Sequence, residues 1–179
     1  ASQLGGIAAN QYLTTTAGNA NYIQNTTTEQ TNSNFNISGA GKAISFDTAT
    51  RFKIRGSDVF SIDGNQNVFL GVNVGNLNLG NNNAFAGSSA GRDNTNGQEN
   101  SFFGAFSGQK NNTGGQNSFF GAGSGDNNTS GTGNTFAGYL AGINNVSGNN
   151  NTMIGAAATA TGNNISNATA IGAFARVTQ

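Results

Sequence analysis

Few side chains of this sequence could carry out chemistry, and they limit the reactions available to it. There is no His and no Cys, so the commonest general base and the thiolate metal ligand are both missing. The only acids are Glu29, Asp47, Asp58, Asp63, Asp93, Glu99 and Asp126. No two of them occupy equivalent positions of the repeat described below, so the carboxylate pair of a glycosidase is not apparent. We therefore predict that the chain is not an enzyme and has no catalytic residue, metal site or cofactor.

The charge of the chain bears on its partners. Charged residues make up only 8% of the sequence, and seven basic residues balance seven acidic ones. Such a chain has no strong field to attract a nucleic acid backbone or an anionic membrane. No stretch approaches the roughly 18 apolar residues of a membrane-spanning helix. We expect no nucleic acid partner and no direct membrane insertion.

The composition is dominated by small and amide residues. The 179 residues include 32 Asn and 28 Gly, with no Pro and no Trp. Disordered chains usually combine high net charge with few aromatic residues, whereas this one has zero net charge and 13 Phe. The bias therefore favours a repeat over disorder.

A five-residue motif recurs through residues 67–172. It consists of Asn, any residue, two apolar residues and Gly, as in NVFLG at 67–71, NSFFG at 100–104 and NTMIG at 151–155, with a degenerate copy, ATAIG, at 168–172. The glycines that end the motif, here called anchor glycines, are spaced by 16 residues once and then by 17 five times. They are Gly71, Gly87, Gly104, Gly121, Gly138, Gly155 and Gly172.

This period predicts an all-β fold. About 17 residues is too short for helical repeats, and short Phe-rich segments between Gly and Asn are typical of strands. Each repeat would be one coil of a parallel β-solenoid with about seven coils, which at about 4.8 Å per coil make a rod roughly 30 Å long. Stacking aligns the first residue of each motif, which predicts a structural ladder of amide side chains. The ladder would contain Asn67, Asn83, Asn100, Asn117, Asn134 and Asn151.

Two further sets of glycines recur between the motifs and predict turns, because Gly and Asn reach positive φ at low cost. We use the word column for residues at equivalent positions of successive coils. One column follows the anchors by four residues and the other by ten. In the first of these, Thr159 and Arg176 replace Gly, so we expect the last two coils to be atypical. The two columns are Gly75, Gly91, Gly108, Gly125 and Gly142, and Gly97, Gly114, Gly131 and Gly148.

Two adjacent columns of each predicted strand are apolar, and adjacent strand residues point to opposite faces. A single solenoid buries only one of them inside its coils, and the sequence leaves open which one. The other would form an apolar stripe larger than a soluble monomer exposes, so identical chains are expected to associate along their long axes. The residues predicted for the coil core or the chain interface are Phe69, Phe85, Phe102, Phe103, Phe119, Phe120, Phe136, Ile154 and Ile171.

The first 66 residues differ from the repeats. Residues 1–34 are rich in Asn, Thr and Gln with sparse apolar positions, which predicts an extended arm or stalk. Residues 35–66 contain short alternating segments at 35–38, 43–46, 51–55 and 59–62, separated by turn residues. We interpret this region as a β-rich cap for the first coil. The cations of RFKIR at 51–55 are typical of a solvated strand face, with a site for an anionic glycan as the alternative.

The motifs NSFFG, NTMIGAAA and, above all, NATAIGAFA at 167–175 resemble the head repeats of trimeric autotransporter adhesins of the YadA type. The resemblance covers residues 67–179. It implies a left-handed parallel β-roll in a homotrimer, displayed outside the cell and used for adhesion, and it transfers no catalytic or metal residue. Similar repeats occur in fibre proteins that resemble phage tail spikes and end in a self-cleaving chaperone.

We therefore expect a structural and interaction segment of an extracellular trimeric fibre. The first hypothesis is an adhesin head on a bacterial surface, held at the outer membrane by other parts of a longer chain, with a surface, glycan or protein ligand that the residues do not identify. The alternative is a shaft segment of a phage-like tail fibre or tail spike. An ice-binding solenoid is a minor alternative, because the threonines fall in more than one column.

Overall fold

The structure, a computed structural model, describes residues 3–4, 7–8, 51–54, 57–62 and 65–178. The chain divides into two compact units, residues 1–46 and 47–179. In the first unit, β1 (Gln3–Leu4) pairs antiparallel with β2 (Ile7–Ala8). The rest of the predicted arm, and the strands predicted at 35–38 and 43–46, lie outside the described residues.

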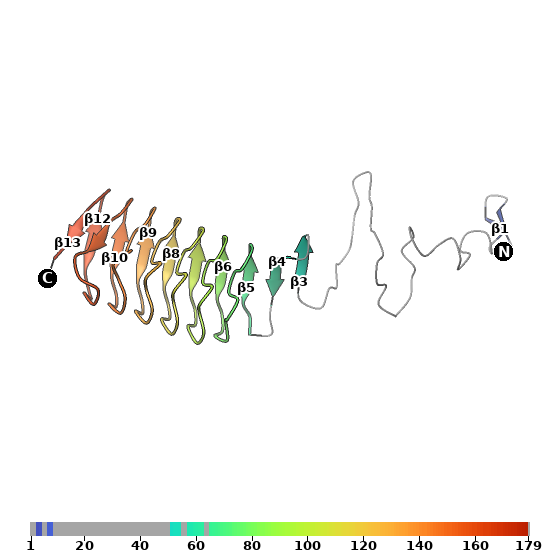
Figure 1. Ribbon diagram of the computed structural model, residues 1–179, viewed down its shortest axis with the longest axis horizontal. Helices are drawn as coiled ribbons and strands as arrows, with labels where there is room; N and C mark the ends of the chain where they lie inside the picture. The colour runs from blue at the N-terminus through green and yellow to red at the C-terminus, as the bar shows by residue number, and fades with distance from the viewer. Residues whose placement is uncertain (1–2, 5–6, 9–50, 55–56, 63–64, 179) are drawn as a thin grey trace. The chain divides into compact units, whose positions relative to one another are not determined.

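The described part of the second unit is all-β, and its main element is a nine-stranded sheet in the order β12-β10-β9-β8-β7-β6-β5-β4-β3. From β5 to β12 the neighbours are parallel, and each residue pairs with its counterpart one repeat away, as in Phe102↔Phe119. Figure 1 shows these strands stacked in chain order. The strands are β3 (Arg51–Ile54), β4 (Ser57–Ile62), β5 (Val68–Leu70), β6 (Ala84–Ala86), β7 (Ser101–Phe103), β8 (Ser118–Phe120), β9 (Thr135–Ala137), β10 (Thr152–Ile154) and β12 (Thr169–Ile171).

This topology confirms the predicted parallel β-solenoid with a period of about 17 residues. The seven parallel strands delimit six complete coils, and residues 172–178 begin a seventh. Backbone hydrogen bonds between coils continue outside the strands, as from Gly108 N to Ser124 O (2.9 Å). Each coil is therefore held by its neighbours along most of its length.

The sheet begins with antiparallel strands. β4 pairs antiparallel with both β3 and β5, and the register of the β3–β4 pair shifts between Phe52 and Lys53. The strands predicted at 51–55 and 59–62 correspond to this pair. On one side of β5, β4 therefore takes the place that a preceding coil would occupy.

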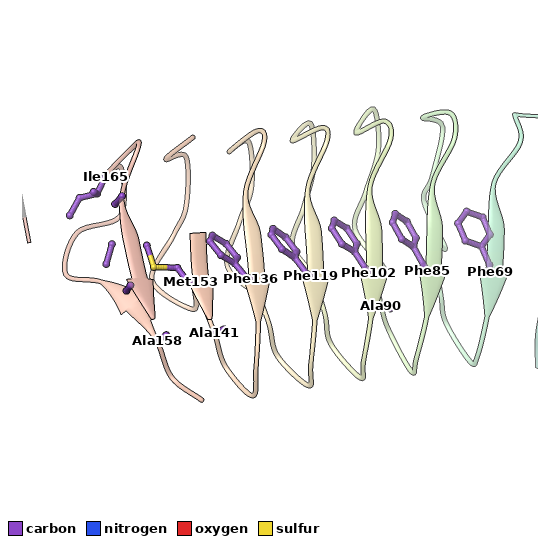
Figure 2. Packing of buried hydrophobic residues seen from close by; sticks show 13 residues of the cluster. Phe69, Phe85, Ala90, Phe102, Phe119, Phe136, Ala141, Met153, Ala158 and Ile165 are labelled. Atoms are coloured by element: carbon purple, nitrogen blue, oxygen red, sulfur yellow. The ribbon is translucent and has the colours of Figure 1, made fainter. Parts of the chain in front are cut away.

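The solenoid core answers which apolar column faces inward. The middle residue of each three-residue strand is buried, and in the first five coils it is Phe (Figure 2). Successive rings stack with centroids 4.7 to 5.4 Å apart. The buried column consists of Phe69, Phe85, Phe102, Phe119, Phe136, Met153 and Ala170.

The phenylalanine column explains the glycines that follow the anchors by four residues. A Cβ placed on Gly108 would lie 2.5 Å from the ring of Phe102, and the other glycines of the column meet the rings of their own coils in the same way. In the last two coils the core residue is Met153 or Ala170, and the position holds Thr159 or Arg176. These coils form an additional parallel pair there, β11 (Thr159–Ala160) with β13 (Arg176–Val177). A smaller core side chain thus permits a side chain and a strand where the other coils need Gly and a turn.

Candidate interaction surface

The asparagines at the start of each motif lie inside the coils. All six predicted members are at most 1% exposed, so they present no surface to a ligand. Asn100 illustrates the shared geometry: its Oδ1 accepts from the backbone N–H of Asn117 (2.9 Å), and its Nδ2 donates to the carbonyl of Gly114 (2.9 Å). The column therefore links one coil to the next and ties the strand to the opposite turn.

A second asparagine column, not foreseen from the sequence, lies seven residues after the anchors. Asn111 Nδ2 donates to Asn94 Oδ1 (2.6 Å) and to the carbonyl of Gly114 (2.8 Å), and Asn128 Nδ2 donates to Asn111 Oδ1 (2.7 Å). Each such glycine carbonyl accepts from one amide of either column. The 17-residue spacing of these asparagines was the available signal. The column consists of Asn78, Asn94, Asn111, Asn128 and Asn145.

The outer side of the coils carries an exposed surface that we call the apolar face. It combines the residue before each anchor glycine with the first and second residues after it, from the third coil onward. Tyr139, Ile171 and Phe174 are 62%, 68% and 75% exposed. Its members are Phe103, Ala105, Phe106, Phe120, Ala122, Gly123, Ala137, Tyr139, Leu140, Ile154, Ala156, Ala157, Ile171, Ala173 and Phe174. Of the predicted interface residues, Phe103, Phe120, Ile154 and Ile171 lie on it.

A tight turn at each anchor glycine forms the corner of this face. In the third coil the N–H of Ser107 donates to the carbonyl of Gly104 (3.1 Å), which closes a turn with Phe106 at φ +60°. Leu140 and Phe174 hold the same left-handed conformation in their coils, at φ +54° and +58°. Bulky residues rarely adopt this conformation, and residues held there cluster at functional sites. Gly or Asn would be the local choice at this position, so apolar side chains are kept at the corner despite the backbone.

The exposed aromatic rings pack on each other. Phe103 and Phe120 stack at 5.2 Å with planes 3° apart. Rings that cover one another in this way offer less free ring face for a sugar to stack on, whereas their edges remain open to apolar side chains. The apolar face is therefore better suited to another protein surface than to a glycan.

The charged residues lie elsewhere on the coils. Arg92 forms a two-bond ion pair with Asp93 (2.7 and 2.8 Å), and its hydrogen bond lowers the pKa of the Asp93 carboxyl. Lys110 Nζ donates to Asn127 Oδ1 (2.6 Å). Partial burial raises the pKa of the Asp126 carboxyl. These positions, five and six residues after the anchors, make the coil surface polar away from the apolar face.

The stacked coils with their buried Asn and Gly columns define a β-solenoid repeat protein. Comparison of the chain with protein-family models, with curated proteins and with solved structures gave no match. Within the described ranges, no group of three or more His, Cys, Asp or Glu side chains is placed to hold a metal ion. In the same ranges no helix is long and apolar enough to cross a membrane.

Proposed function

We propose that this chain is a structural and interaction segment of an extracellular trimeric fibre, an adhesin head that attaches a bacterial cell to surfaces or to other cells. The observation that carries the proposal is the apolar face, which runs along the stack of coils. Large exposed apolar patches mark sites of protein association. The resemblance of the repeats to YadA-type heads adds the left-handed coil and the number of chains.

The two ends and the remaining surface fit this role. The antiparallel β3–β4 hairpin would serve as the cap that shields the first coil from unwanted strand addition. The turns nine residues after the anchors carry polar side chains that stay on the surface, among them Asn96, Thr113 and Ser130. Amides and hydroxyls in this position could bind a glycan or protein ligand outside the trimer, which leaves the apolar face for assembly.

The location can be tested on intact cells of the source organism. Antibodies raised against the purified chain should label unpermeabilised cells, and the label should disappear after treatment of whole cells with protease. Labelling that requires permeabilisation would contradict the surface location. Label on virus particles but not on the cell envelope would favour the shaft of a phage-like tail fibre instead.

Adhesion itself can be measured with coated microspheres. Beads carrying the purified chain should be retained on fibronectin, collagen, laminin or mucin layers more strongly than beads carrying serum albumin. Replacement of Thr113 and Ser130 by Ala should reduce retention if the polar turns contact the ligand. Equal retention of both kinds of bead on all four layers would count against an adhesin that binds matrix or mucin components.

A further inference from the structure

We infer that the apolar face is where three copies of the chain meet, with the copies parallel and with equivalent coils at the same level. The inference rests on the proposed trimeric fibre and assigns its contact surface. Three observations identify the occupant of the face as further copies of this chain: its area, its lack of charge, and the sizes of its side chains coil by coil.

The area is sufficient for a stable interface. The five aromatic residues of the face, at positions 103, 106, 120, 139 and 174, are 41% to 75% exposed. At about 200 Å² for a full aromatic side chain, they alone offer roughly 500 Å². The exposed isoleucines Ile154 and Ile171 add to this value, which brings it toward the ~800 Å² that each partner contributes to a standard interface.

The face has no charge with which to select a different partner. Every charged side chain of the described ranges lies in another column, including Arg92, Lys110 and Arg176. A surface without charge is typical of the core of homo-oligomer contacts, where the match is made by shape. The same apolar stripe on each copy satisfies this condition by symmetry.

Side-chain size along the face is balanced within each coil. Where the residue before the anchor is large, as in Phe103 and Phe120, the residue after it is Ala. The fifth coil reverses the order, with Ala137 before the anchor and Tyr139 after it. In a ring of three copies, the surface before the anchor of one chain meets the surface after the anchor of its neighbour. The space left by Ala137 is then filled by Tyr139 of the neighbouring copy only if equivalent coils are level.

The backbone adds an independent reason. Phe106, Leu140 and Phe174 hold large side chains in the left-handed conformation at the turn. Their exposed apolar area and their backbone strain are both unfavourable in an isolated chain. Burial against a neighbouring chain offsets both, and this accounts for the presence of large residues where Gly123 and Asn73 show that small or polar ones suffice.

The first arm of the test is the mass of the complex in solution. By light scattering the unmodified chain should have three times the chain mass of 18.1 kDa. Phe120→Glu and, separately, Ile154→Lys should reduce the measured mass threefold, whereas Thr113→Glu on the polar turns should leave it unchanged. Circular dichroism confirms that each variant is folded, which is expected because these side chains are exposed.

The second arm measures the alignment of the copies. The chain has no Cys, so introduced thiols report alone. A chain with Ile171→Cys, folded together with a differently tagged chain with Ala173→Cys, should form a disulfide between the two tags. The same chain paired with Ser88→Cys, five coils away, should not.

The outcomes separate the inference from the proposed function. A trimer that persists in both Phe120→Glu and Ile154→Lys overturns the assignment of the face and leaves the trimeric fibre standing. Cross-linking of position 171 with position 88 overturns the parallel arrangement. A monomeric unmodified chain overturns the trimer and this inference together. Threefold loss of mass in both variants, with cross-linking of 171 to 173, supports the inference.

Discussion

At the scale of single residues, the buried phenylalanines determine where the glycines must be. The ring of Phe102 occupies the space that a Cβ on Gly108 would take, six residues further along the same coil. The chain contains its own comparison, because Met153 and Ala170 are followed six residues later by Thr159 and Arg176. The glycines of this column are therefore required by packing as well as by the turn.

Gly108→Ala should be strongly destabilising. The added methyl group would lie 2.5 Å from the Phe102 ring, and Ala would be held at φ +55°. Overpacking costs about 1–3 kcal/mol and the left-handed conformation about 1 kcal/mol more, so we expect a loss of roughly 2–4 kcal/mol in urea unfolding. Gly162→Ala is the matched control, since its Cβ would contact only the flexible Ile165 side chain at 3.4 Å. A similar loss in both variants would show that the ring contact is not responsible.

The second asparagine column makes a comparable prediction. Asn111→Ala leaves the Oδ1 of buried Asn94 without its donor and opens a small cavity. An orphaned buried polar group costs about 1–3 kcal/mol, so the midpoint of thermal unfolding should fall clearly. Asn96→Ala, in an exposed turn of the neighbouring coil, should change the midpoint little. Equal midpoints for the two variants would contradict a structural role for the amide column.

At the scale of elements, the coil is the unit of stability. Its strand has only three residues, which is too short to be stable by itself. Backbone bonds to both neighbours, the stacked rings and the two amide columns supply what the strand lacks. Because each coil contacts only its neighbours, removal of one whole coil leaves the same contacts between the coils that remain.

Deletion of residues 105–121 tests this view of the coil. The deletion joins Gly104 to Ala122 and removes one full period, so every column stays aligned. The shortened chain should fold with an unchanged far-ultraviolet circular dichroism spectrum per residue and a slightly lower unfolding midpoint. Deletion of residues 105–113, which removes about half a period, should abolish the cooperative transition because it shifts every later column. Cooperative unfolding of the half-period variant would contradict stacking by column.

Much of this element structure was predictable from spacing. The anchor glycines gave the period, the strands and the parallel stacking, because identical positions must align when coils stack. The orientation of the strands was not predictable from the two apolar columns, since Phe102 and Phe103 are equally apolar and point to opposite faces. The spacing from Phe102 to Gly108 held the answer, because only a ring inside the coil competes with that glycine for space. The apolar corner was missed because its alanines and single large residues follow no fixed residue type.

At the scale of the whole molecule, assembly and folding should be coupled. If the apolar face is buried between three chains, the folded trimer is favoured by mass action. The unfolding midpoint should therefore rise when the protein concentration is raised a hundredfold, as measured by differential scanning calorimetry. Phe120→Glu, which removes the contact, should have a lower midpoint that does not depend on concentration. A concentration-independent midpoint for the unmodified chain would show that the coils gain nothing from assembly.

The first asparagine column also gives the rod a direction. Every Oδ1 in the column from Asn67 to Asn151 accepts from the coil that comes later in the chain. A finished coil thus presents preplaced acceptors to the next one, while the β4 strand occupies the opposite side of β5. Coils can consequently be laid down one after another from the β3–β4 hairpin, each using its predecessor as a template. Such one-way growth suits a chain that folds while it emerges progressively from a pore.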